Sequence, residues 1–163
     1  MKIRKVELKD AAQIAEIYNY YILKTHHTFE TEALNAEEME RRIVETSADY
    51  PYLVADIDGE IQGYLYAAQF KLRQAYKHSV EVSIYVKNNT KQQGIGSALY
   101  ERFFGALEDS DVHAMVAGIS LPNEASVKFH EKLGYEKVAH FREVGYKLGR
   151  WVDVGFWELL NKF

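Results

Sequence analysis

The chain has 163 residues and a formal net charge of −4 at pH 7, so it is long enough for one domain with a substantial apolar core. It contains no cysteine, which excludes disulfide bonds, thiolate metal ligands and a cysteine nucleophile. The acidic charge gives no indication of a nucleic-acid surface, and no apolar run approaches the roughly 20 residues of a membrane-spanning helix. The charged N-terminus, MKIRKVELKD, has no stretch typical of a signal peptide, so we expect a cytoplasmic protein that binds neither nucleic acid nor membranes.

The first part of the chain predicts a strand, two helices and a hairpin. Asp10 can cap a helix that begins at Ala11, and Asn35 followed by Glu38 is typical of a capping box at the start of a second helix. Asp58-Gly59 lies between two apolar runs and predicts a hairpin turn. The stretch between the two helices has no clean period and is expected to be a loop. The predicted ranges are strand 2–6, helix 11–23, loop 24–34, a helix after Asn35 through about residue 46, strand 51–57 and strand 60–69.

The pattern changes from strand to helix in the stretch 80–100. Apolar β-branched residues occupy every second position of 80–86, with Glu81 between them, which is typical of a strand. A polar loop, 87–93, leads to Gly94 and Gly96, and apolar residues then follow at helical spacing. Glycines at a helix start let an anion approach the bare N–H groups without a Cβ in the way. The sequence therefore predicts a carboxylate-bearing strand that leads into a phosphate-binding helix start.

The last third of the chain predicts two more strands and a helix before a final strand. A basic and aromatic connection, 70–77, precedes the central strand. Pro122-Asn123 opens a helix that ends at Gly134, a common C-terminal stop. The remaining predicted strands are 112–119, 135–144 and 152–160, the last two separated by Gly145, Gly149 and a basic turn. The element order is β-α-α-β-β-β-α-β-α-β-β, which predicts a single α/β domain over residues 1–163.

This order, with Gly-x-Gly after the fourth strand, resembles the GNAT N-acetyltransferase fold. The stretch 91–96, KQQGIG, resembles the family's Arg/Gln-x-x-Gly-x-Gly/Ala pyrophosphate loop, although Lys91 replaces the Arg or Gln. The stretch 122–135, PNEASVKFHEKLGY, resembles the family's motif of Asn, a helix and an aromatic-x-Lys-x-Gly-Phe/Tyr ending. The resemblance implies an acyl-CoA N-acyltransferase fold with a mixed central sheet flanked by helices.

The chain is also similar to one GNAT subfamily, the phosphinothricin and methionine-sulfoximine acetyltransferases. The similar stretches are 18–22, 66–86, 126–135 and 145–159, and the run WVDVGFW at 151–157 is the most particular of them. The resemblance implies acetyl-CoA as co-substrate and a small amino acid as acceptor, acetylated on its α-amino group. It also implies a homodimer and resistance to herbicides of the phosphinothricin type.

Glu81 and His130 are the candidate catalytic residues. Acetyl transfer needs a neutral amine, and Glu81 can accept the amine's proton directly or through water. The alternative for Glu81 is a solvent-facing or edge carboxylate. The imidazole of His130 stands where many GNAT members have a Tyr that protonates the departing thiolate, and it can donate or accept a proton near neutral pH. The alternative for His130 is a structural histidine held by a hydrogen bond.

The candidate cofactor-binding residues lie at the end of the fourth strand, at the helix start and on the later Asn. Backbone N–H groups at the strand end would stabilise the thioester oxygen, and the glycine loop would bind the coenzyme A pyrophosphate. A flexible strand-to-helix turn is the alternative for the loop, and a helix N-cap is the alternative or additional role of the Asn. These residues are Ile84, Tyr85, Val86, Lys91, Gln92, Gln93, Gly94, Ile95, Gly96, Ser97 and Asn123.

The candidate acceptor-binding residues are Phe29, Glu30, Lys71, Arg73 and Tyr76. A guanidinium suits the α-carboxylate of an amino acid through a bidentate pair, so Arg73 is the preferred ligand. A solvated basic loop is the alternative for Lys71 and Arg73. Phe29 and Glu30 lie in the irregular loop that shapes the acceptor pocket of GNAT proteins.

We expect no catalytic metal, because adjacent histidines such as His26-His27 rarely bind one ion and no further spacing completes a site. Other functions remain open. The acceptor could be another amino acid, a polyamine-like amine or a protein N-terminus, and a GNAT fold can also bind acyl-CoA without catalysis. A nucleotide-binding regulator would need a third glycine and a downstream acidic residue, which are missing. The aromatic residues of the last strands either pair across a two-fold dimer or complete the monomer core.

Overall fold

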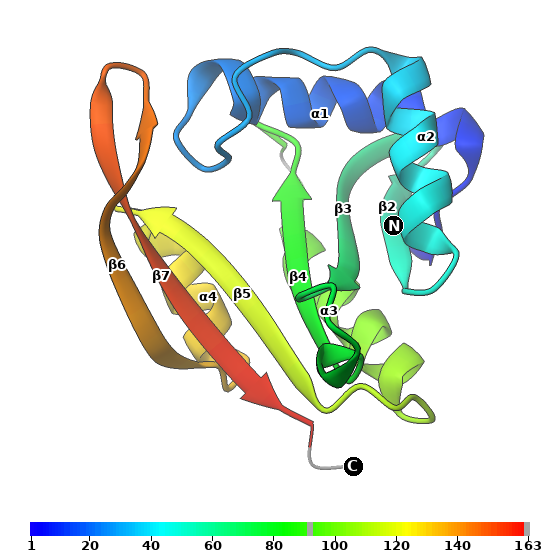
Figure 1. Ribbon diagram of the computed structural model, residues 1–163. Coiled ribbons are helices and arrows are strands. Elements are labelled where there is room, and N and C mark those ends of the chain that lie inside the picture. The colour runs from blue at the N-terminus through cyan, green and yellow to red at the C-terminus, as the bar shows by residue number, and fades with distance from the viewer. Residues whose placement is uncertain (91–92, 162–163) are drawn as a thin grey trace. The chain divides into compact units, whose positions relative to one another are not determined.

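The computed structural model describes residues 1–90 and 93–161, in which strands and helices follow one another in the predicted order (Figure 1). The elements are β1 (Lys2–Lys5), a 3-10 helix (Leu8–Asp10), α1 (Ala11–Lys24), α2 (Ala36–Ser47), β2 (Tyr52–Ile57), β3 (Glu60–Gln69), a 3-10 helix (Gln74–Tyr76), β4 (Ser79–Val86), α3 (Ile95–Leu107), β5 (Ala114–Leu121), α4 (Glu124–Lys132), β6 (Glu136–Lys147) and β7 (Arg150–Leu160). The strands form one seven-stranded sheet in the order β1-β2-β3-β4-β5-β7-β6. The β4–β5 pair is parallel and the β1–β2, β2–β3, β5–β7 and β6–β7 pairs are antiparallel, which confirms the mixed α/β sheet.

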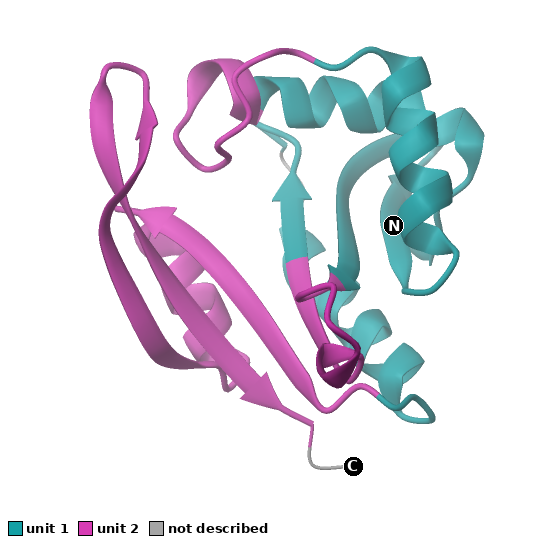
Figure 2. Cartoon of the chain, in the orientation of Figure 1, with its two compact units in different colours: residues 1–20, 34–68, 83–111 teal, residues 21–33, 69–82, 112–163 magenta. Residues whose placement is uncertain are grey.

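The described residues fall into two compact units that are interleaved along the sequence (Figure 2). Unit 1 comprises 1–20, 34–68 and 83–111, and unit 2 comprises 21–33, 69–82 and 112–163. The boundary crosses β4, so the segment with Glu81 belongs to unit 2 and the end of the strand belongs to unit 1. The single domain over residues 1–163 stays a prediction.

In unit 1, α3 buries most of the apolar stripe that its sequence predicts, which is Ala98, Leu99, Phe103 and Leu107. Residues three and four apart share one face of a helix, so one stripe of side chains can enter the core. Leu99, Phe103 and Leu107 are buried, whereas Ala98 is only partly buried. Ile95 at the helix start, which was not part of the predicted stripe, is also buried. No helix in the described part of the chain is long and apolar enough to cross a membrane.

Two of the local signals in unit 1 act as predicted. Asp58 and Gly59 both have positive φ, 54° and 85°, as a tight two-residue turn between β2 and β3 requires. The side chain of Asn35 accepts a hydrogen bond from the Glu38 backbone N–H at 2.8 Å and caps α2. The Glu38 carboxylate, expected to complete the capping box, is engaged by Arg41 and Arg42.

The prediction that Asp10 caps α1 is wrong. Its carboxylate accepts two hydrogen bonds from the Arg4 guanidinium, at 2.7 and 2.8 Å, and one from the Glu7 backbone N–H at 2.8 Å. Asp10 therefore closes the short 3-10 helix whose N-cap is Glu7. Arg4 also donates to Asp56 on β2 at 2.9 Å, so one guanidinium joins β1, β2 and the entry to α1.

In unit 2, β5, β6 and β7 form an antiparallel layer with α4 packed against it (Figure 1). The indole N–H of Trp157 on β7 donates to the Glu131 carboxylate of α4 at 3.1 Å, and the Trp157 side chain is buried. Gly134 follows α4 with φ of 94°, which confirms the predicted helix stop. Trp157 thus belongs to the core of this unit.

The predicted break between the last two strands is in the wrong place. β6 continues to Lys147 and β7 begins at Arg150, so the hairpin is longer than predicted. The turn is Leu148-Gly149, with φ of 51° and 76°, and Gly145 lies inside β6 opposite Val152. Similarly, β5 spans Ala114–Leu121, two residues later than predicted. A glycine in a strand can mark a close approach by another group rather than a turn.

The Arg4–Asp10 pair gives a testable prediction for stability. We expect Asp10→Asn to lower the free energy of unfolding by about 3 kcal/mol, because it leaves the Arg4 charge without its main partner in a site where Asp10 is only 2% exposed. Burial raises the pKa of Asp10, but the hydrogen bonds from Arg4 and the Glu7 amide outweigh it and hold the pKa below its usual range. The stabilisation is therefore complete above the ordinary Asp pKa and lost as the pH falls through the lowered value.

Urea unfolding at pH 7 and at pH 3 would measure this difference. The matched control is Glu45→Gln, which removes an exposed ion pair with Arg41 and should change stability much less than Asp10→Asn, because surface ion pairs contribute little. Equal effects of the two substitutions would contradict the assigned role of Asp10.

Candidate functional site

The predicted site residues divide between the two units. Unit 2 carries Phe29, Glu30, Lys71, Arg73, Tyr76, Glu81, Asn123 and His130, and unit 1 carries Ile84, Tyr85, Val86, Gln93, Gly94, Ile95, Gly96 and Ser97. Lys91 and Gln92 lie outside the described residues.

Glu81 lies on an interior strand of the sheet rather than at an edge. Its strand, β4, pairs in parallel with β5 at Ser79–Ala114, Val80–Met115 and Glu81–Val116. Side chains alternate between the faces of a strand, and Val80 and Val82 on the opposite face are buried. Glu81 itself is half-buried, so it does not match the alternative of a fully solvent-facing carboxylate.

A glycine leaves space beside the Glu81 carboxylate. A Cβ added to Gly118 on β5 would lie 3.4 Å from Glu81 Oε1 and 3.3 Å from the Phe156 ring. Sequence reasoning missed Gly118, although a glycine in the apolar run of β5 is a recognisable signal of close approach. A side chain at this position would cover one side of the carboxyl group.

The environment of Glu81 favours its protonated form. Burial raises the pKa of the carboxyl group because a charge is poorly solvated there, and the positive charge of Lys71 partly opposes the shift. A carboxylate with a raised pKa binds a proton more tightly than an ordinary surface Glu does. It is therefore better suited to accept a proton from a reacting group near neutral pH.

Lys71, Arg73 and Tyr76 lie on the connection between β3 and β4. The Arg73 guanidinium carbon is 5.8 Å from the centre of the Tyr76 ring, and Lys71 Nζ is 5.4 Å from that of Phe70. A cation–π contact through the face of the Arg73 guanidinium leaves its N–H edge available. Lys71 and Arg73 are both exposed, which fits an anion ligand and also the solvated basic loop considered above.

Asn123 is the N-cap of α4. Its side-chain oxygen accepts a hydrogen bond from the Ser126 backbone N–H at 3.3 Å, so the capping alternative is confirmed. The cap engages only the side-chain oxygen of Asn123, and the hydrogen-bond donors of the amide are on its NH₂ group.

His130 is 3% exposed and is held inside unit 2. Its Nδ1 lies 2.8 Å from the Ser126 backbone oxygen, which can only accept, so Nδ1 carries a hydrogen and the neutral ring is basic at Nε2. The ring also makes an edge contact with Tyr135, with centroids 5.3 Å apart. Burial lowers the pKa of His130, and the hydrogen bond to Ser126 partly opposes this. A neutral ring of this tautomer accepts a proton at Nε2 rather than donating one.

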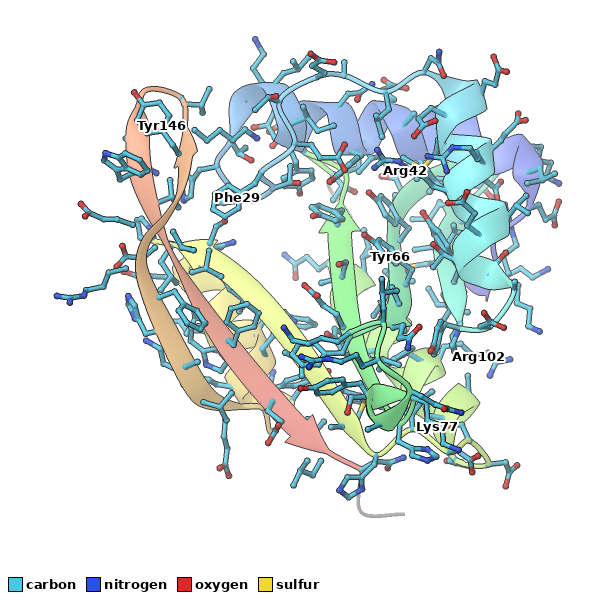
Figure 3. The ribbon with its side chains drawn as sticks, in the orientation of Figure 1. Phe29, Arg42, Tyr66, Lys77, Arg102 and Tyr146 are labelled. Carbon is cyan, nitrogen blue, oxygen red and sulfur yellow. The ribbon has the colours of Figure 1, made fainter. Side chains whose placement is uncertain are left out.

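Phe29 and Glu30 lie in the loop after α1, and Phe29 is beside the β6–β7 hairpin (Figure 3). The Phe29 ring covers Gly145 of β6 so closely that a Cβ there would overlap it. Sequence reasoning missed Lys147, two residues further along β6, which hydrogen-bonds the backbone of the same loop. A lysine between exposed strand residues carries no local signal of burial, so the pattern could not have revealed it.

The start of α3 has the geometry expected of an anion site. Gly94 is its N-cap with φ of 78°, a left-handed conformation that favours glycine, and the Ala98 N–H donates to the Gly94 oxygen at 3.0 Å. The N–H groups of the first helical turn have no acceptor within the helix and point toward its N-terminal end. Ile95 is buried and anchors the turn, whereas Gly94 and Ser97 are exposed.

The end of β4 is fixed close to this helix start within unit 1. A Cβ on Gly63 of β3 would lie 3.0 Å from both the Tyr85 backbone oxygen and the Ile95 side chain. The Tyr85 ring packs against Tyr18 and Tyr64, with centroids 5.0 and 5.5 Å away. Gly63 therefore lets the strand carrying the predicted oxyanion donors approach the predicted phosphate-binding turn.

Within residues 1–90 and 93–161, no group of three His, Cys, Asp or Glu side chains could hold a metal ion. His26 and His27 instead contact each other edge to face, with ring centroids 4.8 Å apart.

Comparison with known proteins identifies the family. Residues 3–155 match the family described as the acetyltransferase (GNAT) domain. The protein belongs to the GNAT acetyltransferase family. A phosphinothricin N-acetyltransferase from Streptomyces viridochromogenes is 37% identical to this GNAT protein over 158 residues, which cover 97% of this chain and 86% of that protein.

Two further relatives also match over nearly the whole chain. An L-methionine sulfoximine/L-methionine sulfone acetyltransferase from Salmonella typhimurium is 33% identical over 164 residues, covering 98% of this chain and 94% of that protein. The solved structure of a GNAT phosphinothricin acetyltransferase from Sinorhizobium meliloti, in complex with AcCoA, has a TM-score of 0.92 and 33% identity, covering 98% of this chain and 87% of that one. The GNAT fold and the acetyltransferase class expected from the sequence are thus confirmed.

The electrostatics of Glu81 can be tested without any substrate. We expect the pKa of Glu81, measured by NMR titration of its side-chain carboxyl carbon, to lie above the ordinary Glu value because of burial. Lys71→Met should raise this pKa further, since it removes the charge that favours the carboxylate. Lys128→Met, which changes an exposed lysine on α4, is the matched control and should leave the titration unchanged. A Glu81 pKa at or below the ordinary value would refute this description of the site.

Proposed function

We propose that this GNAT acetyltransferase transfers the acetyl group of acetyl-CoA to the α-amino group of a small amino acid of the L-methionine sulfoximine or L-phosphinothricin type. The observation that carries the chemistry is the half-buried Glu81 carboxyl on β4, whose pKa is raised by burial. The acceptor type is supported by the relatives named for these two substrates, which match almost the whole chain. The reaction would take place in the cytoplasm.

Glu81 acts as the general base in this proposal. The amine nitrogen attacks the carbonyl carbon of the thioester, a C–N bond forms, and the C–S bond then breaks to release the thiolate of coenzyme A. The nitrogen must lose a proton on the way, and Glu81 accepts it directly or through one water molecule. The space beside Gly118 is where the amine or the water would reach Oε1.

We assign the coenzyme A pyrophosphate to the start of α3. Its negative charge is favoured by the N–H groups of Gln93, Gly94, Ile95, Gly96 and Ser97 and by the positive end of the helix dipole, and Lys91 and Gln92 precede them. Backbone N–H groups of Ile84, Tyr85 or Val86 would stabilise the developing oxyanion. Asn123, whose cap leaves the NH₂ group for other partners, would bind the pantetheine. The thioester is already an activated acyl donor, so no metal is required.

His130 would handle a second proton. The departing thiolate needs a proton, but a neutral imidazole with hydrogen on Nδ1 cannot give one from Nε2. We therefore assign His130 the role of accepting the proton that the ammonium form of the acceptor loses before it attacks, whereas Glu81 accepts the proton that the nitrogen loses after the C–N bond forms. The thiolate would be protonated from solvent. This differs from the donor role of the Tyr that many GNAT members have at the matching position.

Arg73 is the proposed ligand of the acceptor's α-carboxylate. Its contact with Tyr76 orients the guanidinium by its face, so the N–H edge can make a bidentate pair. Lys71 adds positive charge, and both residues favour an anionic acceptor over a polyamine. Phe29 and Glu30 would contact the remainder of the acceptor.

A non-catalytic acyl-CoA-binding module is the second candidate function. Such a module needs the start of α3, but it has no use for a half-buried carboxylate with a raised pKa. The burial that favours the protonated form of Glu81 also lowers the free energy of unfolding at neutral pH. A binding module would gain nothing in return for this loss of stability, whereas an enzyme gains a general base, so we prefer the enzyme.

The decisive experiment is the rate of coenzyme A release with L-methionine sulfoximine or L-phosphinothricin as acceptor. We expect turnover with at least one of them, and Glu81→Gln should lower kcat/KM by roughly 100-fold or more because the base is removed. Glu40→Gln, on the exposed face of α2, is the matched control and should keep wild-type activity.

The same assay tests polyamines, other amino acids and a peptide N-terminus as alternative acceptors. Activity only on one of these would keep the enzyme and replace the acceptor. Binding of acetyl-CoA without turnover on any amine would favour the binding module.

We also propose that the protein is a homodimer formed through the β6–β7 hairpin. Trp151 and Tyr146 are 62% and 60% exposed, and their rings contact each other edge to face. Figure 3 shows Tyr146 on the β6–β7 hairpin. Phe141, Val144 and Leu148 on the same hairpin are also exposed. Aromatic side chains grouped in this way are typical of the buried centre of an interface, and a two-fold pair is the commonest symmetric assembly.

Sedimentation equilibrium would test this assembly. We expect the wild-type mass to be that of two chains, and Trp151→Glu to shift it toward one chain, because a charge would be buried in the interface. Val44→Glu, at an apolar position on α2 that is 55% exposed, is the control and should remain dimeric. A wild-type protein of single-chain mass would rule the dimer out.

A further inference from the structure

We propose that Lys147 is a positioning residue that fixes the acceptor-binding loop 25–30 to the β6–β7 hairpin and thereby sets the affinity for the acceptor. The link to the acceptor rests on the proposed function, because that function places Phe29 and Glu30 in contact with the acceptor. The link between Lys147 and the loop rests on geometry alone.

Lys147 is buried, which is unusual for a lysine. Its side chain is 4% exposed, and its Nζ donates to the Thr28 backbone oxygen at 2.6 Å and to the Tyr21 backbone oxygen at 3.3 Å. A lysine that forms a surface ion pair would reach toward solvent instead. Here the ammonium group donates instead to two backbone carbonyls inside unit 2. The Thr28 carbonyl belongs to the loop, and the Tyr21 carbonyl belongs to the preceding helix, α1.

The contact with Tyr21 places a positive charge at the C-terminal end of α1. The last four carbonyls of a helix lack N–H donors within the helix, and this end of the helix dipole is negative. Tyr21 is in the last turn, and its oxygen also accepts from Thr25 Oγ1 at 2.9 Å. The Thr25 hydroxyl oxygen in turn accepts from the His27 N–H at 3.1 Å. Lys147 therefore completes a hydrogen-bonded turn that starts the loop, and it holds Thr28 near the loop's other end.

The Phe29 ring, next to the Lys147–Thr28 hydrogen bond, packs directly against Gly145. A Cβ on Gly145 would lie 2.6 Å from Phe29 Cε1 and 2.7 Å from Cε2, so the ring occupies the space that any other residue would fill. Gly145 is paired with Val152 in the ladder, and its backbone is thus held by the hairpin. Figure 3 shows Phe29 beside this part of the hairpin. Lys147 and Gly145 together define where Phe29 lies.

A third hairpin residue holds the middle of the loop. Arg150 Nη2 lies 2.7 Å from His26 Nδ1, and the other ring nitrogen of His26 lies 2.9 Å from the Pro122 backbone oxygen. These contacts are exposed, whereas those of Lys147 are buried. Burial lowers the pKa of Lys147, and the negative charge of Glu30 partly opposes this shift. Because the hydrogen bonds of Lys147 are buried, water cannot readily replace them when they are lost.

The test combines hydrogen exchange and steady-state kinetics on the full chain. In Lys147→Met, which keeps the length of the side chain but removes its donors, amides of residues 25–30 should exchange faster than in the wild type. The KM for the amino acid should rise by about tenfold or more, because the loop residues that contact the acceptor are displaced, while the KM for acetyl-CoA stays unchanged. Lys128→Met, at an exposed position of α4, is the matched control for loss of a lysine charge.

A second variant keeps the proposal testable if Lys147→Met does not fold. Gly145→Ala leaves the lysine in place but pushes Phe29 from its position, so it should also speed exchange in residues 25–30 and raise the acceptor KM. In a Phe29→Ala background, Gly145→Ala should add little to the exchange rate, because the overlapping ring is gone.

The outcomes separate this inference from the proposed function. Wild-type exchange rates in residues 25–30 of a folded Lys147→Met, or equal rises in KM for acceptor and acetyl-CoA, would overturn it. Faster loop exchange in a protein that acetylates none of the amines would support the structural role of Lys147 and reject the proposed acceptor.

Discussion

The parallel pairing of β4 with β5 is the constraint on which the proposed chemistry depends. Three residue pairs, ending at Glu81 and Val116, place a carboxylate on a strand in the interior of the sheet. Val80 and Val82 anchor the opposite face in the core, and Gly118 keeps a Cβ away from the carboxyl group. The proposed base is thus positioned by sheet hydrogen bonds and packing rather than by a mobile loop, which gives it the fixed geometry that proton transfer needs. The same enclosure raises its pKa.

Sequence patterns predicted the parts of this protein that depend on neighbouring residues. The Asn35 cap, the Asp58-Gly59 turn and the Asn123 cap each involve residues within three positions of one another, and all three are confirmed. The order of strands and helices followed from hydrophobic periodicity, which the core enforces. The two GNAT motifs are also local in sequence, so the amino-acid order alone was enough to recognise the family. Glu81 was predicted as the general base because it lies in a clear strand just before the glycine loop, and this role stays a prediction.

Features that depend on distant partners could not be predicted in this way. Asp10 precedes a helix and has a capping side chain, but Arg4 and the Glu7 amide occupy its carboxylate. Gly145 is a typical turn residue in sequence, yet it lies within β6 because the Phe29 ring needs the space. Lys147 gives no sign that it hydrogen-bonds a carbonyl more than a hundred positions earlier in the chain. In each case a tertiary contact decided between local possibilities of similar energy.

The burial of Glu81 has a consequence for engineering this enzyme. Because the folded protein binds a proton at Glu81 more tightly than the unfolded chain does, the ionised carboxylate opposes folding at neutral pH. A library screened only for resistance to heat would therefore enrich neutral replacements at this position and discard the proposed base. Any stabilised version intended for use as a biocatalyst must be selected for turnover and heat resistance together, since the two demands conflict at one carboxyl group.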